Sequence, residues 1–349
     1  MIVRRAAVWH GRHDVRIDER AMPPLPGSGM VRIAVDWCGI CGSDLLEYSS
    51  GPVVIPPPVD GVSGASVVLG HEFVGTIVVV GDQAGEWSAG DRVAVDTLVR
   101  CGECAYCRSG AFNLCPYLGV LGLTMDGGLA ELVDVPSYMC YRLDGRTTGD
   151  LAALVEPLAV AVRAVRRATA VELGRVVVLG CGSIGLLCLL TARHQGIREL
   201  VAVDVAVTRR QAATRAGATA VSARVPELAY DHGPWAFIDC TGSANVASQV
   251  VEAAPAQSRI ALVGVTAGEV FLPLIEVLEK ELELVGSLSH DASDFEKAIQ
   301  LLSDTSFDAG WLITRRIVLD DLPSTIATLA EDGDANELKV LVTPTERHE

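Results

Sequence analysis

The chain has 349 residues, 50% of them hydrophobic, so it is long enough for two compact domains with separate cores. Its formal net charge of −16 argues against a nucleic-acid partner, because the overall field would repel the phosphates. No stretch approaches the ~20 apolar residues of a membrane span, and the chain begins without the apolar core of a secretion signal. Together with ten cysteines, this predicts a protein of the reducing cytoplasm with no membrane partner.

The first part of the chain, to about residue 150, predicts a β-rich domain. Runs rich in β-branched residues at 31–39, 73–81, 91–96 and 129–135 alternate with turns that contain Gly and Pro, as short strands do.

A dense group of cysteines follows the third of these runs. It consists of Cys101, Cys104, Cys107 and Cys115, spaced x2, x2 and x7 in CGECAYCRSGAFNLC. Without a secretion signal this spacing favours metal ligands over disulfides, and four thiolates suit the closed tetrahedral cage of a structural zinc ion. The alternatives are free cysteines or a redox loop. We expect a structural zinc lobe at about residues 96–118.

The sequence pattern changes at about Leu151. The run 151–168 has helical periodicity, and from 175 to 264 short buried strands alternate with helices. This predicts an α/β fold with a doubly wound parallel sheet. After about Ser289 we expect a helix and two strands that return to the first domain. The expected division of the chain is 1–155, 156–289 and 290–349.

A GxGxxG match, GCGSIG, follows the strand predicted at 175–179 and opens a helix. Its residues are Gly180, Gly182, Ser183, Ile184 and Gly185, with Cys181 between the first two glycines. In this context the backbone can approach a dinucleotide pyrophosphate at the helix N-terminus. Asp204 ends the next strand, where a carboxylate accepts hydrogen bonds from ribose hydroxyls and repels a 2′-phosphate, which favours NAD over NADP. Arg209 would face the ribose or adenine and soften that preference; the alternative role for Asp204 is a helix N-cap.

Candidate ligands for a second metal ion lie in three separate segments. WCGICGSD holds Cys38 and Cys41, LGHEFVG holds His71 and Glu72, and VEPLAV places Glu156 at a helix start. A catalytic zinc ion takes three protein ligands and keeps one open position, and it lowers the pKa of an alcohol so that hydride can leave. Spacing does not decide between the two cysteines. A core cysteine, a buried His–Glu pair and a helix-start Glu are the alternatives.

With CGICGSD, GHEFVG, the four-cysteine run, EPLAVA and GCGSIG in this order, the chain resembles the zinc-dependent medium-chain alcohol dehydrogenases over essentially its full length. EYSSGP, LGHEFVGTIV and VEPLAVAV make it most similar to the butanediol and sorbitol dehydrogenase subgroup. The resemblance implies a GroES-like catalytic domain around a Rossmann domain. It also implies two zinc ions per chain, one catalytic and one structural, and a homodimer or homotetramer built by extending the Rossmann sheet.

The resemblance also assigns roles in the catalytic metal site. It places the zinc ligands at Cys41, His71 and Glu156, with Glu72 as a nearby carboxylate that exchanges with Glu156 or water. Ser43 matches the hydroxyl that accepts the alcohol proton, and Asp44 the carboxylate that orients His71.

One position departs from the family pattern. Leu46 stands where many relatives have a histidine that relays the proton to solvent, and a leucine cannot carry a proton. Glu47, a cofactor hydroxyl with water, or the substrate itself would then complete the relay. Tyr48 and His290 are candidates for substrate contact, the alternatives being cleft packing and a solvent-facing loop.

We therefore expect an NAD- and zinc-dependent oxidoreductase. It would interconvert a secondary alcohol and a ketone on a polyol-, cyclitol- or aminosugar-like substrate, in specialised metabolism. A 2,3-butanediol/acetoin or sorbitol dehydrogenase is the alternative within the class. A non-catalytic cofactor-binding protein is the alternative outside it.

Overall fold

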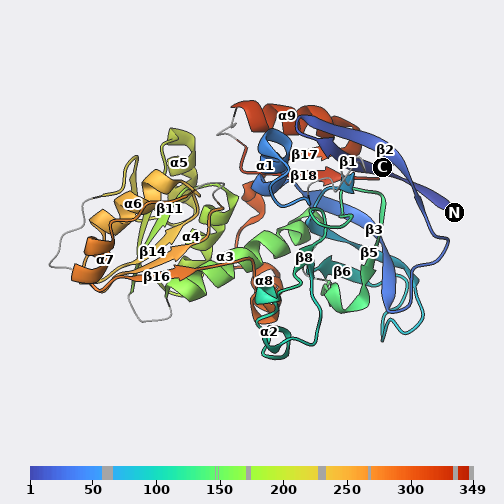
Figure 1. Cartoon of the computed structure of the whole chain (residues 1–349), viewed down its shortest axis with the longest axis horizontal. Coiled ribbons are helices and arrows are strands. Elements are labelled where there is room, and N and C mark those ends of the chain that lie inside the picture. Colours follow the sequence, from blue (N-terminus) through green and yellow to red (C-terminus); the bar gives the residue numbers. More distant parts are fainter. Residues whose placement is uncertain are drawn as a thin grey trace. The chain divides into compact units, whose positions relative to one another are not determined.

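The computed structural model describes residues 1–56, 66–145, 147, 149–169, 174–226, 233–265, 269–332 and 337–345. The chain forms two compact units. Unit 1 contains Met1–Glu156 and Ile299–Glu349, and unit 2 contains Pro157–Ala298. Figure 1 traces both along the chain.

Unit 1 is built on strands that are mostly antiparallel. Its largest sheet has the order β10-β6-β5-β3-β18-β17, with β9 also paired to β3. These strands are β3 (Met30–Gly39), β5 (Glu72–Val80), β6 (Arg92–Val95), β9 (Leu132–Pro136), β10 (Cys140–Arg142), β17 (Ile313–Val318) and β18 (Lys339–Thr343). The four runs expected as strands are β3, β5, β6 and β9. Because β18 pairs with β3, the end of the chain completes the sheet begun near its start.

A smaller sheet has the order β2-β1-β4. Its strands are β1 (Ile2–Gly11), β2 (Asp14–Met22) and β4 (Val67–Val68), and a two-stranded sheet pairs β7 (Leu98–Val99) with β8 (Gly119–Val120). Side chains such as Ile33, Val35 and Phe73 fill the core of the unit.

Unit 1 also contains short helices. They are α1 (Gly42–Ser50), α2 (Ala105–Arg108) and α9 (Leu322–Asp332), with 3₁₀ turns at Phe112–Leu114, Ser137–Met139, Gly149–Leu154, Gly310–Leu312 and Leu319–Asp321.

Unit 2 is a doubly wound parallel sheet, which confirms the predicted fold class. The strand order is β13-β12-β11-β14-β15-β16, and all five pairings are parallel. The strands are β11 (Arg175–Leu179), β12 (Glu199–Val203), β13 (Ala220–Ser222), β14 (Ala236–Asp239), β15 (Arg259–Leu262) and β16 (Glu283–Gly286). The central strands are apolar throughout, as Val176–Leu179 shows, because helices cover both faces of such a sheet.

Unit 2 also contains α-helices (Figure 1). They are α3 (Val155–Ala168), α4 (Ser183–His194), α5 (Val207–Arg215), α6 (Ala244–Ala253), α7 (Leu274–Glu279) and α8 (Ala292–Ser303), of which α3 and α8 run across the unit boundaries. The chain leaves β11 toward β12 and β13, then returns to β14 on the other side. This switch point, at the carboxyl ends of β11 and β14, is where doubly wound sheets bind ligands.

Among the described residues, no helix combines the length and apolar character needed to cross a membrane.

Candidate metal and cofactor sites

Cys41, His71 and Glu72 form a compact cluster of potential metal ligands in unit 1. One donor atom from each lies within 4.8 Å of the others. Strand pairing explains the convergence: β3 and β5 are antiparallel, with Gly39 opposite Glu72. Cys41 follows the end of β3 and His71 precedes the start of β5, so both lie at the same edge of the sheet.

The structure separates the two cysteines that spacing left equivalent. Cys38 is completely buried in the hydrophobic core, and its thiol donates to the carbonyl of Gly39 at 3.7 Å. Burial raises the pKa of Cys38 well above its ordinary value, which favours the neutral thiol. Cys41 is the cysteine that lies beside His71.

The first turn of α1 supplies polar partners for this histidine. Ser43 Oγ lies 3.2 Å from His71 Nε2, and Asp44 Oδ1 lies 3.8 Å from His71 Nδ1. The other oxygen of Asp44 accepts a 2.8 Å hydrogen bond from the backbone N–H of Cys41. One carboxylate therefore contacts two of the predicted zinc ligands, as outer-shell carboxylates do in zinc sites.

The electrostatics of the cluster suit a cation. Burial lowers the pKa of His71, but the negative charges of Asp44, Cys41 and Glu156 outweigh it and raise that pKa well above its ordinary value. Burial also raises the pKa of Glu156 to about 8. A site that stabilises an imidazolium and disfavours another carboxylate attracts a divalent cation for the same reason. The residues thus fit a zinc ion.

Glu156 lies in the first turn of α3 and is 8% exposed. It interacts electrostatically with His71 and Glu72, but the compact cluster contains Glu72 in its place.

Lys339 is a buried member of this site that the sequence analysis missed. Its Nζ donates to both carboxylate oxygens of Glu72, at 2.9 and 2.7 Å, and to the carbonyl of Ile40 at 3.1 Å. The available signal was a single lysine at the start of an otherwise apolar strand, LKVLVT.

Glu47 is not available as a proton relay, which removes one of the alternatives raised by Leu46. Its side chain is fully buried. The carboxylate accepts hydrogen bonds from the backbone N–H groups of Val53, Val54 and Ile55, so it organises the loop after α1.

Glycines hold in place residues 69–71, which connect β4 to β5 and are called the His71 loop. Gly70 has φ +96°, and the position of its missing Cβ is 2.7 Å from Cys38 Sγ. Gly128 N–H donates to Gly70 O at 2.8 Å. A Cβ on Gly127 would lie 2.1 Å from the same oxygen. Backbone thus packs directly on backbone behind His71, which only glycine permits.

The four lobe cysteines converge as expected. The Sγ atoms of Cys101, Cys104, Cys107 and Cys115 lie within 4.8 Å of one another. None is in a disulfide, so the donors fit a closed thiolate cage. Arg100 anchors the lobe, because its guanidinium lies 3.7 Å above the Phe112 ring and pairs with Asp96 at 2.6 Å.

The glycine motif of unit 2 forms the turn from β11 into α4. Gly180 has φ +82°, and a Cβ on Gly185 would lie 1.9 Å from Gly180 O. Gly182 is the N-cap of α4, with no atom within 4 Å of its missing Cβ. Ser183 and Ile184 begin the helix. The open space at this helix N-terminus fits a pyrophosphate.

Asp204 lies directly after β12 and is linked to this turn. Its Oδ2 accepts from Cys181 N–H and its Oδ1 from Ala206 N–H, both at 2.8 Å. Ala206, and not Asp204, is the N-cap of α5. Arg209 is half-buried, and its Nε has no hydrogen-bond partner among the described residues.

The two candidate substrate residues are both buried. Tyr48 is 7% exposed in the core of unit 1, with its ring edge-on to His13 at 5.2 Å. His290 is completely buried in unit 2, 5.1 Å from the Phe295 ring. The alternative raised for His290, a solvent-facing position, is therefore wrong, because its side chain is buried.

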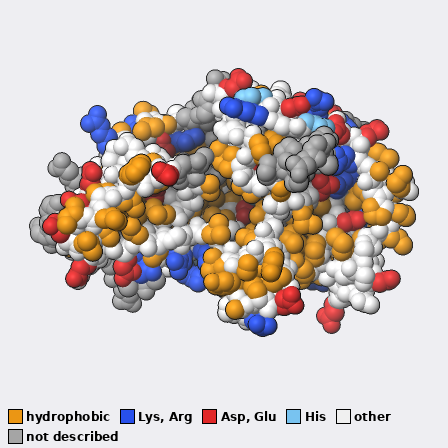
Figure 2. Space-filling model, in the orientation of Figure 1, with side chains coloured by type: hydrophobic (Ala, Val, Ile, Leu, Met, Phe, Trp, Pro, Cys, Tyr) orange, Lys and Arg blue, Asp and Glu red, His pale blue; other side chains and the backbone are white. Residues whose placement is uncertain are grey.

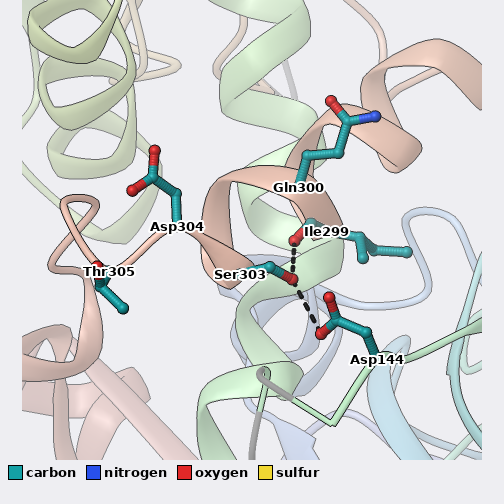
Figure 3. Close-up of a pocket in the computed structure, with 6 residues that line it drawn as sticks. All are labelled: Asp144, Ile299, Gln300, Ser303, Asp304 and Thr305. Atoms are coloured by element: carbon teal, nitrogen blue, oxygen red, sulfur yellow. Dashed lines mark hydrogen bonds between the residues drawn. The ribbon is translucent and has the colours of Figure 1, made fainter.

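An open cavity of about 570 Å³ lies elsewhere in unit 1 (Figure 3). Ser303 Oγ lies between Asp144 and the Ile299 carbonyl, at 3.1 and 2.9 Å. The lining residues are Asp144, Ile299, Gln300, Ser303, Asp304 and Thr305, and none belongs to a predicted site.

Comparison with known proteins covers nearly the whole chain. Residues 27–145 match the alcohol dehydrogenase GroES-like domain, and residues 149–343 match the glucose dehydrogenase C-terminus. The (R,R)-butanediol dehydrogenase of Bacillus subtilis is 32% identical over 97% of this chain and 99% of its own. The sorbitol dehydrogenase of Bombyx mori is 31% identical over 97% of both chains. The crystal structure of the 2R,3R-butanediol dehydrogenase from Bacillus subtilis superposes with a TM-score of 0.86, covering 98% of this chain and 100% of that one at 32% identity.

Gly127→Ala is expected to displace the His71 loop, because the new methyl group would lie 2.1 Å from Gly70 O. Overpacking of this kind costs about 1–3 kcal/mol. We expect a lower melting temperature and less bound metal, measured by calorimetry and metal analysis. Gly145→Ala is the matched control, because nothing lies within 4 Å of its Cβ position. Identical results for the two variants would contradict a role for Gly127 in holding the loop.

Proposed function

Because the chain belongs to the zinc-dependent medium-chain alcohol dehydrogenases, which act on CH–OH groups with a nicotinamide cofactor, we propose that it interconverts a secondary alcohol and a ketone with NAD. The proposed substrate is a polyol, a cyclitol or an aminosugar. The observation that carries the proposal is the cluster of Cys41, His71 and buried carboxylates in unit 1. Unit 1 is the proposed catalytic domain and unit 2 the proposed NAD-binding domain.

In this proposal Cys41, His71 and Glu156 hold the catalytic zinc ion. Bound there, zinc acts as a Lewis acid that lowers the pKa of the substrate hydroxyl. Asp44 orients His71 and the Cys41 backbone through the contacts described above. Cys101, Cys104, Cys107 and Cys115 hold a second, structural zinc ion.

Ser43 is the proposed first acceptor of the alcohol proton. Its hydroxyl lies at the start of α1, 3.2 Å from His71 Nε2, and both accepts and donates hydrogen bonds. Leu46 cannot pass the proton on, and the Glu47 carboxylate is occupied by backbone N–H groups. In this proposal the proton leaves Ser43 through a cofactor hydroxyl with water, or through the substrate itself.

NAD is the proposed cofactor. Gly182 at the α4 N-terminus would receive the pyrophosphate, and Asp204 would receive the adenosine ribose hydroxyls. Backbone N–H groups already fix both Asp204 oxygens, so the charge that opposes a 2′-phosphate is rigidly placed.

The test is NAD(P)H formation by zinc-loaded protein on secondary alcohols, vicinal diols, hexitols, inositols and aminocyclitols. We expect turnover of at least one polyhydroxy substrate, with NAD preferred by wild type and a weaker preference in Asp204→Ala. Activity on 2,3-butanediol or sorbitol alone would support the second candidate function, which the named relatives favour. No activity on any alcohol would contradict the proposal, and an unchanged cofactor preference would remove the role of Asp204.

Cys41→Ser and Cys104→Ser should affect different properties: the first should abolish activity, and the second should lower stability. Cys41→Ser is expected to bind one zinc ion instead of two and to lose activity while its melting temperature changes little. Cys104→Ser opens the closed thiolate cage, so it should lower the melting temperature by several degrees. Metal analysis and calorimetry on both variants measure this. Two zinc ions in Cys41→Ser, or an unchanged melting temperature in Cys104→Ser, would contradict the corresponding site.

A homodimer or homotetramer formed through unit 2 is also proposed. β16 is the edge strand of the parallel sheet. Exposed apolar side chains lie next to it in sequence, on and before α7, where hydrophobic side chains gather in Figure 2. They are Phe271, Leu274, Ile275 and Leu278. Apolar groups exposed this far, beside an unpaired edge, support pairing with a second copy.

Light scattering on Leu274→Glu/Leu278→Glu tests the dimer. We expect at least a dimer for wild type and a monomer for the variant, because two buried charges would be introduced at the interface. Val207→Glu on α5 is the control, since Val207 is 60% exposed near the opposite edge of the sheet. A variant that keeps the wild-type mass would contradict this interface.

A further inference from the structure

An open pocket in unit 2 lies at the amino ends of the parallel strands. It has a volume of about 470 Å³ and is lined by Arg193, Gly196, Ile197, Arg198, Gly217 and Thr219. These residues come from the end of α4 and from the segments that lead into β12 and β13. Parallel sheets bind cofactors at the carboxyl ends of their strands, so this pocket is separate from the proposed NAD site. We propose that it binds phosphate, either free or as the ester of a small molecule.

Two arginines line this pocket without a protein partner. Among the residues that the structure describes, neither Arg193 nor Arg198 forms a hydrogen bond or an ion pair through its side chain. The acidic residue next in sequence, Glu199, pairs instead with Arg175, at 3.0 Å. The chain has 44 acidic and 28 basic residues, yet no carboxylate is among the residues that line the pocket. The two guanidinium groups therefore create a local positive potential that attracts an anion.

The end of α4 does not account for Arg193. A basic residue in the last turn of a helix commonly donates to carbonyl groups that have no intrahelical partner. Here the carbonyls of residues 191–193 already accept backbone N–H groups from residues 195–197, at 2.9, 3.0 and 3.1 Å. Arg193 donates to none of them, so its guanidinium remains available to a ligand.

Gly217 fixes the position of Arg193 at the pocket. Its φ is +105°, and a Cβ there would lie 2.4 Å from Arg193 Cδ and 3.0 Å from Arg193 Nη1. The arginine side chain thus lies directly over the glycine backbone, and any other residue would push it away. Thr219 is already committed, because its hydroxyl accepts from Leu200 N–H at 3.1 Å and donates to Leu200 O at 2.9 Å. The two guanidinium groups therefore supply the donors for a ligand.

The charge and the donors of the pocket favour phosphate over other anions. A phosphate ester carries about −1.5 to −2 charges at pH 7 and has three strong acceptor oxygens, whereas a carboxylate carries a single charge. Two guanidinium groups balance the dianion, and each can donate two parallel hydrogen bonds to its oxygens. The volume of about 470 Å³ is typical of a small-molecule site, so it also has room for the organic part of an ester.

The test is a calorimetric titration of the zinc-loaded protein with inorganic phosphate and with phenyl phosphate, which has no alcohol group to react. Ionic strength is held constant, and an excess of NADH keeps phosphate out of the cofactor site. We expect saturable binding, with a dissociation constant raised about tenfold or more in Arg193→Gln and in Arg198→Gln, because each variant loses a charged pair of donors. Binding of either probe supports the proposal, and the tighter one identifies the source of the phosphate.

Arg224→Gln is the matched control, at an exposed arginine of the same unit outside this pocket, and should bind as wild type does. Gly217→Ala keeps both charges but displaces Arg193, so it should also weaken binding. Arg193 and Arg198 are exposed, so their variants should fold, which the melting temperature checks. No saturable binding by wild type, or one dissociation constant for all three arginine variants, would overturn the inference. Acetate that binds as tightly as phosphate would overturn the choice of ligand.

Discussion

The buried negative charge around His71 is the constraint on which the rest of unit 1 depends. Asp44 and Glu72 are almost inaccessible to solvent, and Glu156 is nearly so. Charges of the same sign repel strongly in a low dielectric and are tolerated only when cations compensate them. Lys339 compensates Glu72. The carboxyl groups and the thiol around His71 raise the pKa of its imidazole well above the ordinary value, so the site favours positive charge and suits a metal ion.

The groups that interact in this site come from strands near both ends of the chain, so these strands must lie side by side. β3 carries Cys41 at its end, β5 begins after His71, and β18 delivers Lys339 from the end of the chain. Close approach of these segments leaves no room for side chains at Gly39 or Gly127. Glycine at these positions therefore allows the close contacts through which the buried polar groups reach their partners.

Features whose residues lie within one short run of the chain could be predicted from the sequence. The strand–turn–helix around Gly180 and the cysteine lobe each lie within one short run, so spacing alone indicates their chemistry. The Glu72–Lys339 pair could not be predicted in this way, because its residues lie far apart in the chain and meet only through strand register. Glu47 shows a second limit: a glutamate near the serine proposed to accept the proton looks available for proton transfer until its backbone partners are known.

The four-cysteine lobe and the cluster at His71 differ in their donor atoms and in their burial, and these differences suit them to different roles. The lobe offers four equivalent sulfur donors, three of them on half-exposed cysteines, and four thiolates complete a tetrahedral shell. The cluster at His71 mixes sulfur, nitrogen and oxygen donors, is more deeply buried, and has the Ser43 hydroxyl beside its imidazole. A shell that the protein completes can only stabilise the fold, whereas an incomplete shell next to a proton acceptor can bind and activate a hydroxyl group. In the proposed function, chemistry therefore belongs to the second centre.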